Sequence, residues 1–313
     1  MAQYKQIKDF IGKTPLIYLP TLSQEVGATI LGKCEFMNPC GSVKDRAALA
    51  LIEAAERDGS INDQTTIIEA TSGNTGIGLA FVAAIKGYKV ILTMPESMTL
   101  ERRKLLKALG ATIVLTPAPL GMTGALEKAA ELARHIGNVF IPKQFDNPAN
   151  PEIHYQTTAP EILADTNGEV DYFIAGVGTG GTIAGVSRFF KEHKPEVEIV
   201  AVEPTDSPVL SGGEAGPHMI QGIGAGFIPN NIKSTDYDTI IQVSNDDAFK
   251  AARLLAQKEG VLCGISSGAN IHATLELAKK EGDSNKTFVC ILCDFGERYL
   301  STTLFEQEEK DEN

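Results

Sequence analysis

Residues 172–182 read YFIAGVGTGGT, an apolar run that passes directly into a glycine-rich loop. The segment that follows, 183–191, is expected to form a helix. Strand, glycine loop and helix in this order place the backbone amides of the loop at the helix N-terminus, where they can bind a phosphate. The stretch therefore predicts an α/β fold with an anion-binding loop at the end of one strand.

The pattern of strand, loop and helix recurs along the chain. Apolar strands that alternate with helices indicate parallel sheets covered by helices on both faces. The expected strands are 65–69, 89–93, 111–115, 172–177, 199–202, 261–263 and 288–292, and the expected helices are 47–55, 79–86, 100–109, 183–191 and 269–279. Prolines concentrate between residues 141 and 160, which marks the expected crossing between two lobes. Ligand clefts favour such boundaries.

Composition excludes several classes of protein. The chain has 313 residues, of which 43% are hydrophobic and 22% charged, as in a globular protein long enough for two lobes. Its net charge of −12 argues against a nucleic-acid partner, because phosphate-backbone binding needs a basic surface. Neither a signal peptide nor a membrane-spanning run is evident, so we expect a cytoplasmic protein with reduced cysteines and no membrane partner.

Cys290 and Cys293 raise the question of a metal site. Both lie in the apolar segment 287–293, which is expected to be a buried strand. Residues three apart on a strand point to opposite faces, so the two thiols cannot bind one metal ion without a turn between them. We therefore predict buried structural thiols and no metal.

The glycine loop allows two interpretations. It contains a GxGxxG pattern at residues 176–181, and Glu203 follows near the position at which a dinucleotide fold places its ribose-binding acid. A nicotinamide-dependent oxidoreductase is therefore one alternative. Thr179 and Thr182 favour another ligand, because two hydroxyls can donate to a small phosphate monoester, whereas a pyrophosphate usually relies on bare glycine amides.

Lys44 lies in a second motif. Residues 38–46 read NPCGSVKDR and lead into the expected helix 47–55, so Lys44 falls at or near a helix N-terminus. The helix dipole makes that an unfavourable place for a cation. Either the ammonium group extends into water, or positive potential and desolvation lower the lysine pKa and free its amine to attack a carbonyl. This segment alone leaves both open.

Two further loops precede expected helices. Residues 264–268 read GISSG, the GxSxG pattern of hydrolase nucleophiles. The only later histidine, His272, lies in the following helix, and no acid separates it from Ser266, so we do not expect a catalytic triad. Residues 71–76 read TSGNTG, and their neutral donors beside a helix start suit a carboxylate.

Together these motifs resemble the fold-type II pyridoxal 5′-phosphate (PLP) enzymes, specifically the family of cysteine synthases (O-acetylserine sulfhydrylases) and cystathionine β-synthases. The resemblance covers nearly the whole chain, and the order and spacing of its motifs are more specific than any one of them. The matching stretches are IGKTPL (11–16), SVKDR (42–46), TSGNTG (71–76), QFDNPANP (144–151), QGIGAGFIP (221–229) and FGERYLST (295–302).

The resemblance implies a tryptophan synthase β-like fold of two three-layer αβα lobes with mostly parallel, twisted sheets. The N-terminal lobe would comprise residues 1–13 and 35–146, and the C-terminal lobe residues 14–34 and 147–313. The N-terminal lobe would carry the cofactor lysine and a substrate loop that closes over the cofactor, and the C-terminal lobe would carry the phosphate loop.

The family's roles then fall on matching positions. Lys44 is similar to the Schiff-base lysine and general base, Asn74 to the partner of the cofactor's ring oxygen, and Ser266 to a neutral partner of the pyridine nitrogen. The phosphate loop would be Gly178, Thr179, Gly180, Gly181 and Thr182, and the substrate carboxylate would bind Thr71, Ser72, Asn74, Thr75 and Gln144. The implied reaction is a β-replacement that makes L-cysteine from O-acetyl-L-serine and sulfide through an aminoacrylate, releasing acetate.

The resemblance also implies a homodimer and allows the C-terminal tail of a serine acetyltransferase as a partner. Thr123 and Met219 stand where cysteine synthases commonly carry lysine, and both changes could alter use of the second substrate. Cystathionine β-synthase activity with homocysteine and an O-phosphoserine donor therefore remain alternatives on the same fold.

Overall fold

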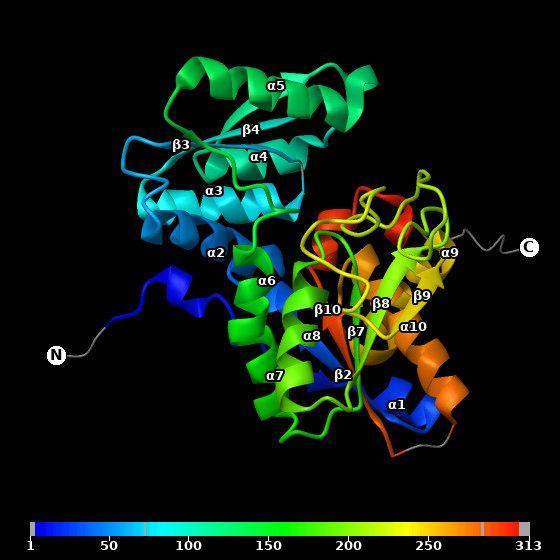
Figure 1. The fold of residues 1–313 in the computed structure, drawn as a ribbon. Helices are drawn as coiled ribbons and strands as arrows, with labels where there is room; N and C mark the ends of the chain where they lie inside the picture. Colours follow the sequence, from blue (N-terminus) through cyan, green and yellow to red (C-terminus); the bar gives the residue numbers. More distant parts are fainter. Residues whose placement is uncertain (1–3, 72, 283–284, 307–313) are drawn as a thin grey trace, which may run out of the picture.

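Two β-sheets organise the chain, whose residues 4–71, 73–282 and 285–306 are described by a computed structural model (Figure 1). The larger sheet has the strand order β1 (Leu16–Tyr18), β2 (Thr29–Cys34), β10 (Thr287–Leu292), β7 (Tyr172–Gly176), β8 (Glu198–Pro204) and β9 (Thr239–Val243). The smaller has the order β5 (Thr112–Thr116), β4 (Lys89–Pro95), β3 (Thr66–Ala70) and β6 (Val139–Phe140). Every described strand pair is parallel except β1 with β2, which confirms the predicted mostly parallel α/β class.

Helices connect and cover these strands. The α-helices are α1 (Pro20–Val26), α2 (Lys44–Arg57), α3 (Asn74–Lys86), α4 (Leu100–Ala108), α5 (Gly121–Ile136), α6 (Ala149–Ile153), α7 (Ala159–Asp165), α8 (Gly181–His193), α9 (Asn245–Glu259) and α10 (Ile265–Glu281). Short helical turns are η1 (Ile7–Phe10), η2 (Glu35–Met37), η3 (Ala118–Leu120), η4 (His154–Thr158), η5 (Gly296–Tyr299) and η6 (Thr303–Phe305). Within the described ranges, no helix has the length and apolar composition needed to cross a bilayer.

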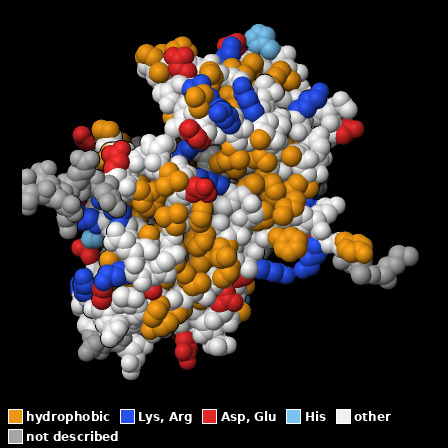
Figure 2. Space-filling model, turned by 180° about the vertical axis from the view of Figure 1, so that it is seen from behind, with side chains coloured by type: hydrophobic (Ala, Val, Ile, Leu, Met, Phe, Trp, Pro, Cys, Tyr) orange, Lys and Arg blue, Asp and Glu red, His pale blue; other side chains and the backbone are white. Residues whose placement is uncertain are grey.

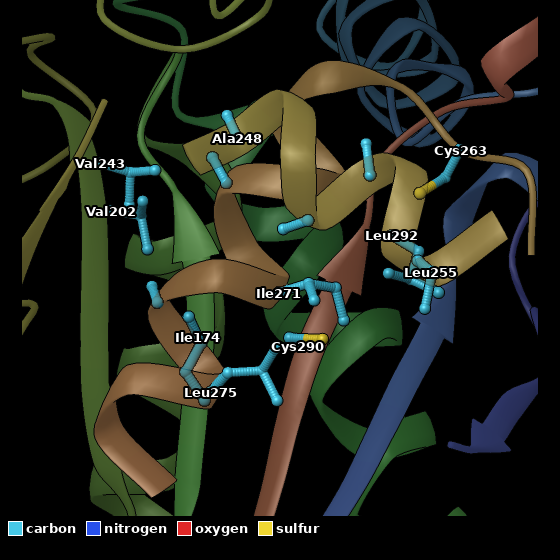
Figure 3. Close-up of a cluster of buried hydrophobic side chains, with 14 of the residues drawn as sticks. Ile174, Val202, Val243, Ala248, Leu255, Cys263, Ile271, Leu275, Cys290 and Leu292 are labelled. Carbon is cyan, nitrogen blue, oxygen red and sulfur yellow. The ribbon is translucent and has the colours of Figure 1, made fainter. Parts of the chain in front are cut away.

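The larger sheet is buried on both faces, as its continuous apolar strands predict. Alternate residues of β10 belong to different cores: Cys290 packs with α9 and α10, whereas Val289 packs with α7 and α8. Figure 3 shows the first of these cores, in which Ile271 and Leu275 of α10 lie over the sheet. Helices on both faces give this lobe its three layers.

The smaller sheet forms the other lobe (Figure 1). Its core joins apolar residues of β3 and β4 to α2, α3 and Leu106 of α4, and α5 also contacts β3 and β4. Strands β1 and β2 belong to the larger sheet although they precede the smaller one in the chain. The residue limits of the two lobes stay a prediction.

The structure differs from the expected elements at one strand and at several helix starts, among them those of α2, α3 and α10. Residues 261–263 were expected to form a strand, but they make only an isolated bridge between Cys263 and Phe295. This apolar run is the short connection from α9 to α10, and it is buried by helix packing rather than by sheet pairing, a case that hydrophobicity alone does not distinguish. In addition, α2 begins at Lys44, three residues before its predicted start, so the lysine is itself the first helical residue.

Candidate active site

A cavity lies where the carboxyl ends of strands from both sheets meet the N-termini of helices. Its lining includes Lys44 at the start of α2, Asn74 at the start of α3, Ser266 in the first turn of α10, the glycine loop before α8, and Asp294 after β10. The structure therefore brings together residues that four separate motifs contribute.

Lys44 is half-buried at the start of α2, next to the end of β10, with its amine directed away from solvent. The backbone N–H of Val43 donates to the carbonyl of Cys293 at 2.9 Å, and Ser42 forms a bridge with Asp294. Burial lowers the pKa of the Lys44 amine, although the nearby acidic groups Cys293, Asp294 and Glu35 act in the opposite direction. Lys44 is therefore not a surface lysine with its ammonium group in water, and its amine loses its proton more readily than an exposed one.

The glycine loop joins β7 to α8 and presents its backbone to the cavity. A Cβ on Gly178 would lie 2.2 Å from the carbonyl oxygen of Gly222, and one on Gly181 would lie 2.1 Å from Oδ1 of Asn150. Gly180 has a φ of +78°, which L-residues rarely adopt. Other segments of the same chain thus pack so closely against this backbone that only glycine fits there. No side chain of the loop glycines covers the loop amides.

The two threonines of the loop are held by neighbouring side chains. Nδ2 of Asn150 donates to Oγ1 of Thr179 at 2.9 Å, and Oγ1 of Thr182 lies 3.4 Å from Nε2 of His154. Burial lowers the pKa of His154 to about 3, so this imidazole is neutral at physiological pH. The end of the cavity beside this loop therefore has hydroxyls and amides but gains no charge from His154.

The positions of Glu203 and His272 argue against the dinucleotide-binding and hydrolase alternatives. The buried carboxylate of Glu203 accepts hydrogen bonds from the backbone N–H of Leu210 at 2.8 Å and from the hydroxyl of Ser211 at 2.5 Å. It holds its own following loop rather than facing a ribose site. His272 lies 3.5 Å from Glu276 on the same helix, whereas Ser266 lines the cavity, so no triad forms between them.

The predicted carboxylate loop lies beside the cavity. Thr71 and Thr75 are buried, and the Thr75 hydroxyl donates to Oε1 of Gln144 at 2.6 Å. The structure therefore joins two of the predicted substrate residues that are far apart in sequence. Ser72, predicted to act with them, lies outside the described residues.

Sequence reasoning missed three residues that surround Asn74. Asp294 is 1% exposed and accepts from Nδ2 of Asn74 at 2.7 Å and from the hydroxyl of Tyr299 at 2.5 Å. Arg298 donates to Oδ1 of Asn74 at 2.5 Å. Burial raises the pKa of Asp294. The sequence indicates these three residues only weakly. Arg298 and Tyr299 lie in the matching stretch FGERYLST, and Asp294 is a single acid after an apolar strand.

The donor set fits PLP. The loop of bare amides with two hydroxyls suits its phosphate, a buried amine suits its aldehyde, and the neutral hydroxyl of Ser266 suits its pyridine nitrogen. The fold and this cavity together define a PLP-dependent enzyme.

Comparisons with known proteins agree. The family model described as pyridoxal-phosphate dependent enzyme matches residues 7–294. Cysteine synthase of Staphylococcus aureus is 55% identical over 300 residues, which are 96% of each chain. The chain belongs to this PLP-dependent family and to its cysteine synthase group.

Solved structures show the same likeness. Cysteine synthase from Entamoeba histolytica matches with a TM-score of 0.95 and 44% identity, over 98% of this chain and 92% of that one. An O-acetylserine-dependent cystathionine β-synthase from Helicobacter pylori matches with a TM-score of 0.90 and 40% identity, over 98% of this chain and 100% of the other. The predicted fold-type II architecture is thus confirmed.

Proposed function

We propose that this protein makes L-cysteine from O-acetyl-L-serine and sulfide and releases acetate. The observation that carries the proposal is the placement of the buried Lys44 amine in one cavity with a bare-glycine phosphate loop and the neutral Ser266. The cysteine synthase relatives support the choice of reaction, because they match nearly the full chain.

The proposed cofactor residues surround this cavity. Residues 178–182 would hold the phosphate, Lys44 the carbonyl carbon, Asn74 the ring oxygen and Ser266 the pyridine nitrogen. Bound PLP supplies an electron sink for the pair left when the substrate Cα loses its proton. The Ser266 hydroxyl is uncharged and does not hold the pyridine nitrogen protonated, so it favours elimination, which needs less carbanion stabilisation than transamination.

Lys44 would then act as general base and acid. Its lowered pKa leaves an unprotonated fraction of Nζ that can take the Cα proton and later return it. Thr71, Thr75 and Gln144, with Ser72, would hold the substrate carboxylate and so orient Cα and Cβ. Acetate leaves Cβ and sulfide adds there, which predicts ping-pong kinetics.

A spectroscopic cycle tests the proposal. Purified protein with added PLP is expected to show a visible absorption band. O-acetylserine should convert it, and sulfide should restore it while L-cysteine forms. Absence of any band would overturn the PLP assignment. Restoration of the band by homocysteine but not by sulfide would move the reaction to a cystathionine synthase, and the O-acetylserine-dependent Helicobacter relative makes that possibility specific.

A homodimer in the cytoplasm is the state we infer for the enzyme. In Figure 2, hydrophobic side chains gather in a broad patch on the face seen from behind. Exposed apolar residues include Met37 at 57%, Leu105 at 40% and Leu300 at 60%, and exposed patches of this kind commonly mark protein interfaces. A monomeric mass by light scattering would contradict the dimer. A serine acetyltransferase tail remains a proposed partner, testable by peptide titration of the cofactor band.

A further inference from the structure

Asn74 is bound on both sides by residues from the other lobe. It begins α3 on the smaller sheet, whereas Asp294 and Arg298 follow β10 of the larger sheet. Nδ2 of Asn74 donates to Oδ2 of Asp294 at 2.7 Å, and the guanidinium of Arg298 donates to Oδ1 of Asn74 at 2.5 Å. The amide thus bridges the boundary between the sheets at the wall of the cavity.

These two neighbours select one orientation of the amide. A guanidinium can only donate hydrogen bonds, and Oδ2 of Asp294 is an acceptor here, because it also accepts from the Tyr299 hydroxyl. A rotated Asn74 amide would point its N–H groups at Arg298 and its oxygen at Asp294. Both contacts would then become repulsive and the buried Asp294 carboxyl would lose a donor, so the present orientation is strongly preferred.

The two neighbours are themselves held in place. The Asp294 carboxylate is buried, and its Oδ2 also accepts from the hydroxyl of Tyr299, which is 2% exposed. Its backbone carbonyl accepts from the N–H of Gly264 at 3.1 Å. Arg298 also donates to the backbone carbonyl of Cys40, four residues before Lys44. The pair is therefore a fixed frame rather than a mobile surface contact.

We propose that Asp294 and Arg298 are positioning residues that make Nδ2 of Asn74, rather than Oδ1, the atom presented to the ring oxygen of PLP. Nδ2 carries two N–H groups, of which Asp294 accepts one, so the other is left for the cofactor. The ring oxygen needs a donor, and an amide oxygen in the same place would repel it. The inference rests on the proposed function, which supplies the cofactor.

An exchange of the two polar groups tests this. Asn74→Asp combined with Asp294→Asn keeps net charge and shape, and the carboxylate introduced at position 74 accepts from both Arg298 and the amide introduced at position 294. We expect the thermal unfolding midpoint of the apo-protein to stay near that of the wild type. PLP affinity by equilibrium dialysis should fall roughly tenfold to a hundredfold, because an oxygen now faces the ring oxygen. The pH dependence of the cofactor band should shift as well.

A purely structural role predicts the opposite, because the exchange restores the hydrogen bonds among positions 74, 294 and 298, with the Tyr299 hydroxyl now accepting from the introduced amide instead of donating. Wild-type affinity and an unchanged band in the exchanged variant would therefore overturn the proposal.

A second variant covers the case in which the exchanged protein does not fold. Asp294→Asn with Arg298→Gln leaves net charge unchanged but gives Asn74 two neighbours that both donate and accept. The amide can then rotate, so we expect PLP binding to weaken several-fold and the cofactor band to become heterogeneous. A single band with wild-type affinity would refute the positioning role. Borohydride reduction of wild-type protein with PLP, followed by mass analysis for label on Lys44, tests the proposed function separately.

Discussion

Two buried polar regions flank the first turn of α2, and they differ in how completely their groups are paired. On one side, Arg46 joins a set of ionic groups that we call the Arg46 cluster: Lys33, Glu35, Arg46 and Glu161. On the other side lies the Lys44 cavity, only two residues away in sequence. One region holds the lobes together, and the other is arranged for a ligand.

Pairing in the Arg46 cluster is dense. Arg46 is 1% exposed, and its guanidinium binds Glu35 at 2.7 and 2.8 Å and Glu161 at 2.7 and 2.8 Å. Lys33 lies 2.9 Å from Glu161. Burial alone would raise the pKa of Glu35, but the charge and hydrogen bonds of Arg46 outweigh it and lower that pKa to about 2. The cluster thus stays ionised and links η2, α2 and α7.

In the Lys44 cavity, by contrast, some polar groups lack a hydrogen-bond partner or a counter-ion. Oδ1 of Asp294 is buried without a hydrogen-bond partner among the described residues, and burial lowers the pKa of Lys44. Such groups cost stability, and they persist where a ligand or reaction needs them. In this comparison burial does not distinguish the two regions, whereas the pairing of their charged groups does.

Replacing Lys44 should produce the largest effect. Lys44→Ala is expected to lower turnover by a factor on the order of 10³ or more, because the general base is lost. Apo-protein stability should stay within about 1 kcal/mol, because relief of the lysine's desolvation offsets the lost packing of its methylenes. Steady-state kinetics and urea unfolding measure the two effects. Substantial remaining turnover would remove Lys44 from the base role and break the comparison.

Arg46→Met should show the reverse pattern. The variant leaves Glu35 buried without its cation, so the free energy of unfolding should fall by about 3–5 kcal/mol. Lys128→Met is the matched control, since it removes a cation from an exposed pair with Glu131 at 2.7 Å and should cost less than about 1 kcal/mol. Equal losses in the two variants, measured by urea unfolding, would show that the cluster contributes no more than a surface ion pair.

The two regions also differ in how far the sequence could predict them. Each wall of the Lys44 cavity is a local motif that the sequence shows: a lysine at a helix start, a glycine loop after a strand, a serine at a helix start. Only the resemblance, which rests on the order and spacing of these motifs, assigned them to one site. The Arg46 cluster could not be predicted, because Glu161 lies 115 positions from Arg46 and an isolated acid on a helix predicts only a solvated face. The role of Asp294 could not be predicted for the same reason, since its partner Asn74 is 220 positions away. Pairing across lobes is a property of topology, which local patterns do not contain.

The smallest predicted effect is a pH dependence of stability with opposite signs at two buried glutamates. Glu69 of β3 is 7% exposed, and burial raises its pKa to about 7, despite hydrogen bonds from the Gln144 side chain and the Lys143 backbone. A raised folded-state pKa gives stability that is complete below the unfolded value near 4.5 and is lost as pH rises through about 7. Glu35, with its pKa lowered to about 2, gives stability that is present above about 4.5 and is lost as pH falls toward 2.

Neutral glutamine should therefore act differently at these two positions. Relative to wild type, Glu69→Gln should gain stability on the order of 1 kcal/mol between about pH 5 and pH 8, since no charge is buried and one oxygen still accepts from Lys143. Glu35→Gln should be less stable than wild type at neutral pH, and its deficit should shrink as the wild-type carboxylate is protonated in acid. Thermal unfolding across this pH range measures both curves. Parallel curves for the two variants would mean that pairing with Arg46 does not distinguish Glu35 from Glu69, whose hydrogen-bond donors in the described part of the chain include no cation.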